Sequence, residues 1–451
     1  MRQILFSIVA LLASVTVLLV GNGLMGTLVS VRLTLEAVDP QVRGIIFSAY
    51  YVGLVAGSQW AGRIIHHVGH IRAFATFAAL CTAAILLQGL VVLPAVWFGL
   101  RMLIGFSAAG LYMVVESWLS ERASTASRGR VFSVYQILSY VGLGVGQLLL
   151  PLGDPASMEL FMVVAVLFAL CLIPVALSRA STPPEPAPHT PMALRQTIMG
   201  SPLATWTCLA SGLTSGIIFA VVPAFGIRVG LDLTAVSWLM ASLILGGVIL
   251  QWPIGHLSDY FGRQPLILAV GAATAALCTV IGLYADVLPL WALLVTAAAF
   301  GGVVFTLYPL AVSQANDRIR SGSGFVAVAA ALLFIWGIAA ALGPITGGWV
   351  MSRFGDEGLF LFMAGIGALT SLAALIFRGE STPAREPYRT MARSTPVIID
   401  LDPRAHTEAE STPGLHEDGA PENGPNPSPS LGPDDAADAD FPAPEVTKAS
   451  S

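Results

Sequence analysis

Long apolar stretches separated by short polar loops occupy residues 1–378 of the chain. An α-helix needs about 20 apolar residues to cross about 30 Å of hydrocarbon, and each stretch is long enough to do so. The pattern predicts an all-α membrane protein with twelve transmembrane helices. The predicted spans are residues 4–31, 44–64, 71–93, 96–119, 131–152, 158–178, 203–226, 234–256, 265–286, 289–313, 324–351 and 357–378.

The two halves of this apolar region resemble each other at an offset of 193 residues. A duplicated hydrophobic half is typical of secondary transporters. We therefore expect a six-helix bundle in residues 1–180 and a second one in residues 201–378. The matched pairs are Gly62 and Gly255, Gly69 and Gly262, His70 and Arg263, Ser120 and Ser313, Gly129 and Gly322, and Pro151 and Pro344.

Two segments lack the apolar pattern. Residues 181–200 join the halves, and their proline-rich part, Ser181–Pro191, predicts an extended cytoplasmic linker. Residues 379–451 are rich in Pro and Ser and hold 14 of the chain's 27 acidic residues against 5 basic ones. This composition predicts a disordered acidic tail.

Composition excludes several classes of protein. Hydrophobic residues make up 55% of the chain and charged residues 11%, with a mean hydropathy of +0.77, which is more apolar surface than a soluble core can hide. The single lysine, Lys448, lies far from any glycine-rich turn, so a phosphate-binding loop is excluded. Four cysteines in separate apolar runs favour packing roles over disulfides or zinc. We expect no cofactor, no resident metal and no enzymatic activity.

Arginine positions predict the orientation in the membrane. Twelve of the seventeen arginines that precede residue 379 fall in loops on the N-terminal side. The first apolar run is longer than the core of a signal peptide and should remain as a span. We expect a multi-pass protein of the cytoplasmic (inner) membrane, monomeric, with both termini cytoplasmic and no nucleic-acid partner.

The loop after the eighth span contains the sharpest motif, Gly255-His-Leu-Ser-Asp-Tyr-Phe-Gly-Arg-Gln264. Its glycines permit a tight reversal, and Arg263 can bind a carboxylate or a helix C-terminus. The string resembles the G-x-L-x-D-x-x-G-R signature loop of the major facilitator superfamily. Arg101-Met-Leu-Ile-Gly105 and Gly343-Pro-Ile-Thr-Gly-Gly348 are similar to two further helix motifs of that family. The resemblance covers residues 1–378 and implies two six-helix bundles around a central cavity.

A further string is similar to a bacterial subgroup of that family whose substrates are largely unassigned. It reads Glu116-Ser-Trp-Leu-Ser-Glu-Arg122 and is followed by Arg128-Gly-Arg130. The G-P-x-x-G-G string, however, lies in the eleventh span, whereas drug antiporters of the family have it in the fifth. Multidrug efflux is therefore an alternative within the same fold, and it is disfavoured.

The first half departs from the signature loop. His66 replaces the aspartate and His70 replaces the arginine, so the latch between halves that the family implies is altered here. Three histidines close together also allow a metal site, but headgroup contact explains them as well, and we favour no metal. The residues that we assign to the two gating loops are Gly62, His66, Gly69, His70, Gly255, Asp259, Gly262 and Arg263.

The fourth span places charge in an apolar helix. Arg101, Tyr112 and Glu116 fall on one stripe of the helix, together with Gly105 and Ala109. Charges at such depth are costly and normally face a cavity or a partner. Arg101 and Glu116 are about 22 Å apart along the helix, too far to pair. Glu116 is our candidate for proton coupling, and its alternative role is a structural contact with the arginines that follow it.

Other polar positions inside the spans are candidates for substrate contact. On the fifth span, Gln136, Tyr140 and Gln147 share a face that suits either a cavity lining or hydrogen bonds between helices, whereas Tyr135, Ser139, Gly142 and Gly146 form a packing face. The candidate substrate-binding residues, all polar or aromatic and within apolar spans, are Asn22, Arg101, Tyr112, Gln136, Tyr140, Gln147, Thr214, Ser215, Gln251, Tyr308 and Trp336. Trp252 is a similar candidate, and its alternative role is that of an interfacial anchor, which is usual for aromatic residues near membrane ends.

Together these features predict a secondary active transporter that moves a small organic solute, neutral or weakly charged, by alternating access. Proton coupling would use Glu116, a histidine or an edge acid such as Asp232, because no acid lies near the centre of a span. A uniporter is therefore an alternative. A transporter-like receptor or sensor that signals through the tail is the main alternative from another class.

Overall fold

The structure is a computed structural model that describes residues 2–122, 125–177, 194–318 and 324–377, and their regular secondary structure is helical. Each predicted span overlaps a helix. The elements are α1 (Arg2–Leu35), α2 (Pro40–Val68), α3 (His70–Leu90), α4 (Pro94–Arg122), α5 (Thr125–Gln147), the short 3₁₀ turn η1 (Leu150–Leu152), α6 (Glu159–Leu170), α7 (Leu172–Leu177), α8 (Leu194–Gly200), α9 (Pro202–Arg228), α10 (Leu233–Phe261), α11 (Arg263–Tyr284), α12 (Leu290–Arg318) and α13 (Gly324–Ile376).

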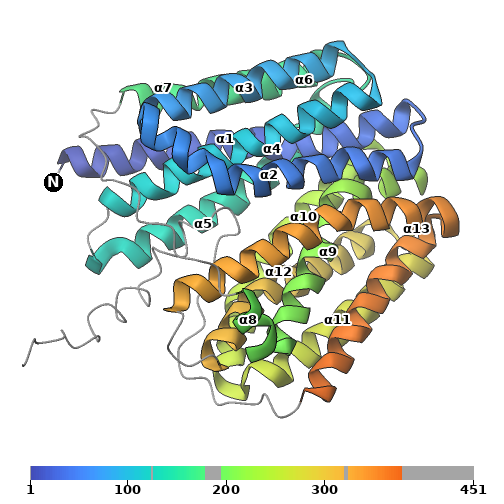
Figure 1. Cartoon of the computed structure of the whole chain (residues 1–451). Helices are drawn as coiled ribbons and strands as arrows, with labels where there is room; N and C mark the ends of the chain where they lie inside the picture. The colour runs from blue at the N-terminus through green and yellow to red at the C-terminus, as the bar shows by residue number, and fades with distance from the viewer. Residues whose placement is uncertain (1, 123–124, 178–193, 319–323, 378–451) are drawn as a thin grey trace, which may run out of the picture. The chain divides into compact units, whose positions relative to one another are not determined.

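Ten helical segments of the described chain are long and apolar enough to cross a membrane. The helix α2, with 29 residues, is long enough but is not among these ten. The helix α13 counts as one of the ten although it has 53 residues, and Gly355 inside it is not helical, with φ 76° and ψ −169°. Figure 1 shows α13 turning back on itself part-way along its length, so it consists of two helical stretches.

Side chains and glycines at the loops explain where several helices begin. Asp39 precedes α2 and accepts a hydrogen bond from the Gln41 amide, and Asp232 does the same for Ala235 at the start of α10. Gly69 separates α2 from α3 with φ 83°, and Gly262 separates α10 from α11 with φ 89°. The offset of 193 residues therefore relates two turns of the same backbone conformation.

Close helix contacts in the first half depend on glycines. A side chain at Gly53 would collide with the Met102 carbonyl, and one at Gly105 would collide with that of Tyr50, so α2 and α4 touch through their backbones. Gly146 of α5 meets the Val20 carbonyl of α1 in the same way. The prediction that Gly142 and Gly146 belong to a packing face is confirmed.

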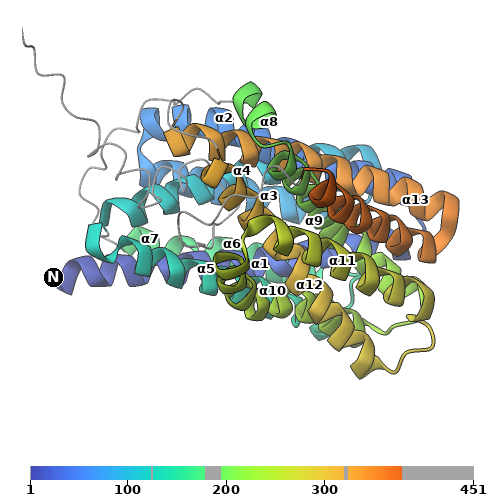
Figure 2. The same cartoon turned by 90° about the horizontal axis from the view of Figure 1, so that it is seen from below.

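The second half contains the corresponding contacts. Gly246 of α10 meets the Ala298 carbonyl of α12, and Gly246 is 193 residues after Gly53. Gly216 of α9 meets the Ala340 carbonyl of α13 and lies 193 residues after Gly23, which in turn meets the Leu143 carbonyl of α5. Figures 1 and 2 show α9, α10 and α12 lying together in this half.

Several contacts join the two halves. The Ser30 hydroxyl at the end of α1 donates to the Ala220 carbonyl of α9 at 2.8 Å. Gly44, near the start of α2, leaves room for the Pro344 carbonyl, and Gly348 of α13 leaves room for that of Pro40. These contacts lie toward the ends of α1 and α2 that meet at the loop 36–39.

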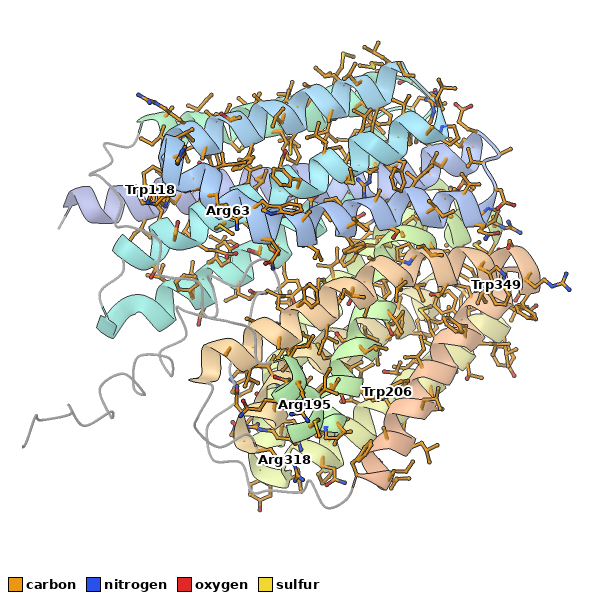
Figure 3. All side chains as sticks on the ribbon, in the orientation of Figure 1. Arg63, Trp118, Arg195, Trp206, Arg318 and Trp349 are labelled. Carbon is orange, nitrogen blue, oxygen red and sulfur yellow. The ribbon has the colours of Figure 1, made fainter. Side chains whose placement is uncertain are left out.

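One helix was not predicted. The structure has α8 within the segment that we expected to be a linker, and residues Leu194–Gly200 contain no proline to prevent a helix. The Thr205 hydroxyl lies 3.4 Å from the Thr197 carbonyl of α8, and Arg318 Nε donates to the Gly200 carbonyl at 3.2 Å. Figure 3 labels Arg195, which is part of α8, and Arg318. The predicted extended stretch 181–191 and the predicted disordered tail 379–451 lie outside the described residues.

Candidate functional site

Arg101 is buried in α4 and is covered by aromatic rings of α2. Its guanidinium carbon lies 5.0 Å from the ring centroid of Phe47 and 4.9 Å from that of Tyr50. The residue is 5% exposed, and its Nε has no hydrogen-bond partner. A cation over two ring faces is partly stabilised by their negative potential. A charge at this depth nevertheless remains costly unless an anion pairs with it.

A cluster of polar side chains continues from Arg101 toward α1. The Tyr50 hydroxyl interacts with both Asn22 and Tyr112, and the Asn22 amide donates to the Tyr112 hydroxyl at 3.4 Å. Three helices therefore bring together two of the predicted substrate-binding residues, Asn22 and Tyr112. Tyr50 was not predicted, because it precedes a second tyrosine in an apolar run and resembles an ordinary packing residue.

Glu116 lies further along the same stripe of α4 and is fully buried. The Tyr135 hydroxyl of α5 donates to Glu116 Oε1 at 3.0 Å. The sequence placed Tyr135 on a packing face and did not identify it as a partner of Glu116. The alternative contacts that we named for Glu116, with Arg122, Arg128 and Arg130, lie outside the side chains that the structure describes.

The residues on the face of α5 that we predicted to line a cavity have different surroundings. Gln147 is 1% exposed, and it donates to the Gly23 carbonyl at 3.0 Å and accepts from Thr27, so it bonds α5 to α1. Tyr140 instead lies near the other half, with its ring 6.4 Å from that of Phe305. Gln136 has a buried Oε1 without a partner. Gln147 therefore matches the structural alternative, whereas Gln136 and Tyr140 stay candidates for substrate contact.

Candidates in the second half are buried in different surroundings. The Tyr308 and Trp336 rings lie 6.2 Å apart, and the Tyr51 ring of α2 approaches Trp336 at 6.3 Å. Thr214 donates to the Ala210 carbonyl of its own helix, and Ser215 is also buried.

Two candidates on α10 are neighbours in sequence but face different surroundings. Gln251 is 4% exposed and its Nε2 has no partner, whereas Trp252 is 75% exposed and stacks on His256. The placement of Trp252 therefore disagrees with its selection as a lining residue. Its high exposure is that of a lipid- or headgroup-facing aromatic residue.

The signature loop of the second half is held by a buried ion cluster. Arg263 is 1% exposed, and its Nε lies 3.1 Å from Asp317 Oδ2 of α12. Its Nη1 lies 2.5 Å from Asp259 Oδ1 and 2.5 Å from the Ser258 hydroxyl. Gly255 is buried beside this cluster. The sequence identified Asp259 and Arg263, and it missed Asp317, which follows 54 residues later.

The corresponding loop of the first half has a weaker attachment. His70 Nε2 lies 2.9 Å from the Ser117 hydroxyl of α4, and its ring is 6.3 Å from that of Trp118. His66 and Gly62 are less buried, and His66 is exposed. Figure 3 shows Trp118 toward the same end of these helices as Arg63 of this loop.

A sequence model of the Major Facilitator Superfamily matches residues 5–333 and again residues 204–400. The chain belongs to the Major Facilitator Superfamily (MFS). It is a multi-pass membrane protein, with ten described helices of sufficient length and hydropathy to span a bilayer.

Relatives of this MFS protein match it over most of their own length. An uncharacterized MFS-type transporter of Yersinia enterocolitica is 29% identical over 376 residues, which are 82% of this chain and 95% of that protein. YcaD, an uncharacterized MFS-type transporter of Escherichia fergusonii, is 27% identical over 369 residues, again 82% and 95%. These names agree with the predicted subgroup of unassigned substrates.

Solved structures share the fold at low sequence identity. The nucleoside transporter NupG matches with a TM-score of 0.69 at 13% identity, over 82% of this chain and 99% of that one. The D-xylose-proton symporter matches at 0.66 and 14%, over 84% and 99%. A bacterial homolog of the human lysosomal transporter Spinster, crystallised inward-facing and unoccupied, matches at 0.65 and 15%, over 86% and 99%. At these identities only the fold is comparable.

Proposed function

We propose that this MFS protein is a secondary active transporter that moves a small organic solute across the cytoplasmic membrane by alternating access. The observation that supports this most is the buried polar cluster of Arg101, Tyr50, Asn22 and Tyr112 in otherwise apolar helices. Polar and ionisable groups inside a membrane are costly, and they normally mark the path of a solute or ion.

The transporter has twelve spans in two six-helix repeats. Ten spans follow from length and hydropathy, the break at Gly355 divides α13 into two, and α2 adds another. The shared backbone conformation of Gly69 and Gly262 supports a repeat of one unit. An even number of spans places both termini on the same side of the membrane, and the excess of arginines in the loops on that side assigns it to the cytoplasm. Reporter fusions at Ser181 and Gly379 should both read cytoplasmic, and a periplasmic reading at either site would contradict this count.

We infer a conformation that is closed at the ends of α1 and α2 that the proposed topology places away from the cytoplasm. Gly44 with Pro344 and Gly348 with Pro40 bring helix backbones together across the halves there. Opening to the opposite side requires these contacts to separate. Bulky substitution of Gly44 or Gly348 should therefore hold this side open, whereas the same change at the uncrowded Gly365 should not.

Proton coupling is assigned to Glu116, which has the Tyr135 hydroxyl as a donor at 3.0 Å. The carboxylate can bind and release a proton, whereas the amide in Glu116→Gln cannot. Glu116→Gln should abolish accumulation against a gradient and preserve downhill exchange.

The experiment is uptake into proteoliposomes from a panel of labelled solutes, with and without a pH gradient, on matched amounts of inserted protein. Glu159→Gln, at the start of α6, is the matched control for loss of one carboxylate. Normal uphill accumulation by Glu116→Gln would limit this residue to a structural role. Absence of transport of every solute by the wild-type protein, with the tail deleted or intact, would favour the receptor.

A further inference from the structure

Two buried arginines, one in each half, have different partners. Arg263 has carboxylate oxygens of Asp259 and Asp317 as partners. Arg101 is almost as deeply buried, yet no carboxylate of the described residues lies within ion-pair distance of it. Its fully buried Nε is a donor without an acceptor. The protein thus keeps an uncompensated cation inside an apolar bundle, which is a costly arrangement without a function for the charge.

Aromatic rings extend from this guanidinium to the other half of the protein. Arg101 lies over the Tyr50 ring, Tyr50 and Tyr51 are 5.4 Å apart, and Tyr51 is 6.3 Å from Trp336. Tyr308 continues the series at 6.2 Å from Trp336. These three ring contacts are edge-to-face. A positive charge therefore lies at one end of a series of rings that connects α2 and α4 with α12 and α13.

We propose that Arg101 binds the anionic group of the transported solute, and that the solute is an organic anion with a planar apolar body. This assignment rests on the proposed transport function and specifies its substrate class. A carboxylate matches the planar fork of the guanidinium and provides the acceptor that Nε lacks. The apolar body packs against the rings of Tyr51 and Trp336, which are both 7% exposed.

The test uses benzoate as the probe, with benzamide as its neutral isostere and acetate as the anion without a ring. Purified full-length protein in detergent is heated with each compound at millimolar concentration. Benzoate should raise the unfolding temperature by about 2–4 °C, because a ligand that binds only the folded state stabilises it. Benzamide and acetate should give less than half of this shift.

Three arginine variants separate binding from folding. Arg101→Gln should remove the benzoate shift and should leave the ligand-free protein as stable as the wild type or more so, because it removes an unpaired buried charge. Arg353→Gln, at an exposed arginine, is the charge-matched control and should keep the shift. Arg101→Lys should retain only part of it, since an ammonium lacks the guanidinium fork.

Equal stabilisation by benzoate and benzamide, or an undiminished benzoate shift in Arg101→Gln, would overturn the proposal. So would the absence of any shift with benzoate in folded wild-type protein. The proposed function is tested separately by counterflow in proteoliposomes. Transport of a neutral solute that is unaffected by Arg101→Gln would leave the transporter assignment standing and reject the anion.

Discussion

The loops 62–70 and 255–263 have the same backbone but different electrostatics. Each joins two helices through a glycine at a φ of 83° or 89° that begins the next helix. In the second loop Arg263 binds two carboxylates, whereas at the equivalent position His70 makes one hydrogen bond to Ser117. Sequence duplication has therefore preserved the turn and not the ion cluster.

This difference indicates that the two halves resist movement unequally at these loops. The cluster around Arg263 fixes α10, α11 and α12 together, because separating them would expose or unpair a buried charge. The loop with His70 attaches α3 to α4 through a neutral contact of lower energy. We expect α2 and α3 to move more readily relative to α4 than their counterparts do in the second half.

The largest expected effect is from removing the arginine. Arg263→Gln leaves Asp317, which is 5% exposed, without its cation and should lower the free energy of unfolding by about 3–5 kcal/mol. His70→Gln at the matched position should lower the free energy of unfolding by less than about 1 kcal/mol, because glutamine can keep a hydrogen bond to Ser117. Thermal unfolding of both variants in one detergent measures the contrast. Equal losses would mean that the two loops are equivalent after all.

The next largest effect on stability is expected from the two carboxylates that Arg263 binds, and it should differ between them. The Asp317 side chain is 3% exposed and that of Asp259 is 30% exposed. Asp317→Asn should therefore lower the free energy of unfolding by about 2–3 kcal/mol, as expected for the loss of a buried hydrogen bond to a charged group. Asp259→Asn should lower the free energy of unfolding by at most about 1 kcal/mol, because water screens the ion pair of Asp259 with Arg263 and replaces it when it is lost. A larger loss for Asp259→Asn would place the essential contact within the loop itself.

How far the sequence predicted these features depends on the range of the interaction. The turns at Gly69 and Gly262 were predictable because glycine reports the local backbone, and the spans because hydropathy reports the surrounding lipid. The pairs Arg263 with Asp317 and Tyr135 with Glu116 were not, because they depend on how helices rotate and cross. The stripe of α4 was predictable, and which rings of α2 would cover it was not.

A smaller and equal effect is expected from the turns themselves. Gly69→Ala and Gly262→Ala place a Cβ in a conformation that favours glycine, and neither new Cβ would meet a heavy atom closer than 3.9 Å. Both glycines combine a positive φ with an extended ψ, of 159° and 161°, a region that is essentially restricted to glycine. Each substitution should therefore lower the free energy of unfolding by about 1–2 kcal/mol through backbone strain alone. Thermal unfolding of the pair measures this, with Gly99→Ala, at an uncrowded helical position, as the control. Unequal losses would show that the shared backbone conformation does not have the same energetic role in both halves.

The smallest net change in stability is expected when two histidines of the first loop are replaced by the aspartate and arginine of the second loop. His70→Arg alone places a cation at a position that is 8% exposed and near Trp118, and it should cost about 1 kcal/mol. Adding His66→Asp supplies a carboxylate four residues earlier, at the spacing of Asp259 and Arg263, and should recover most of that loss. A double-mutant cycle on unfolding temperature isolates this coupling. If the double variant is no more stable than His70→Arg, the new aspartate and arginine do not pair in the first half. The two loops would then share only the conformation of their glycines.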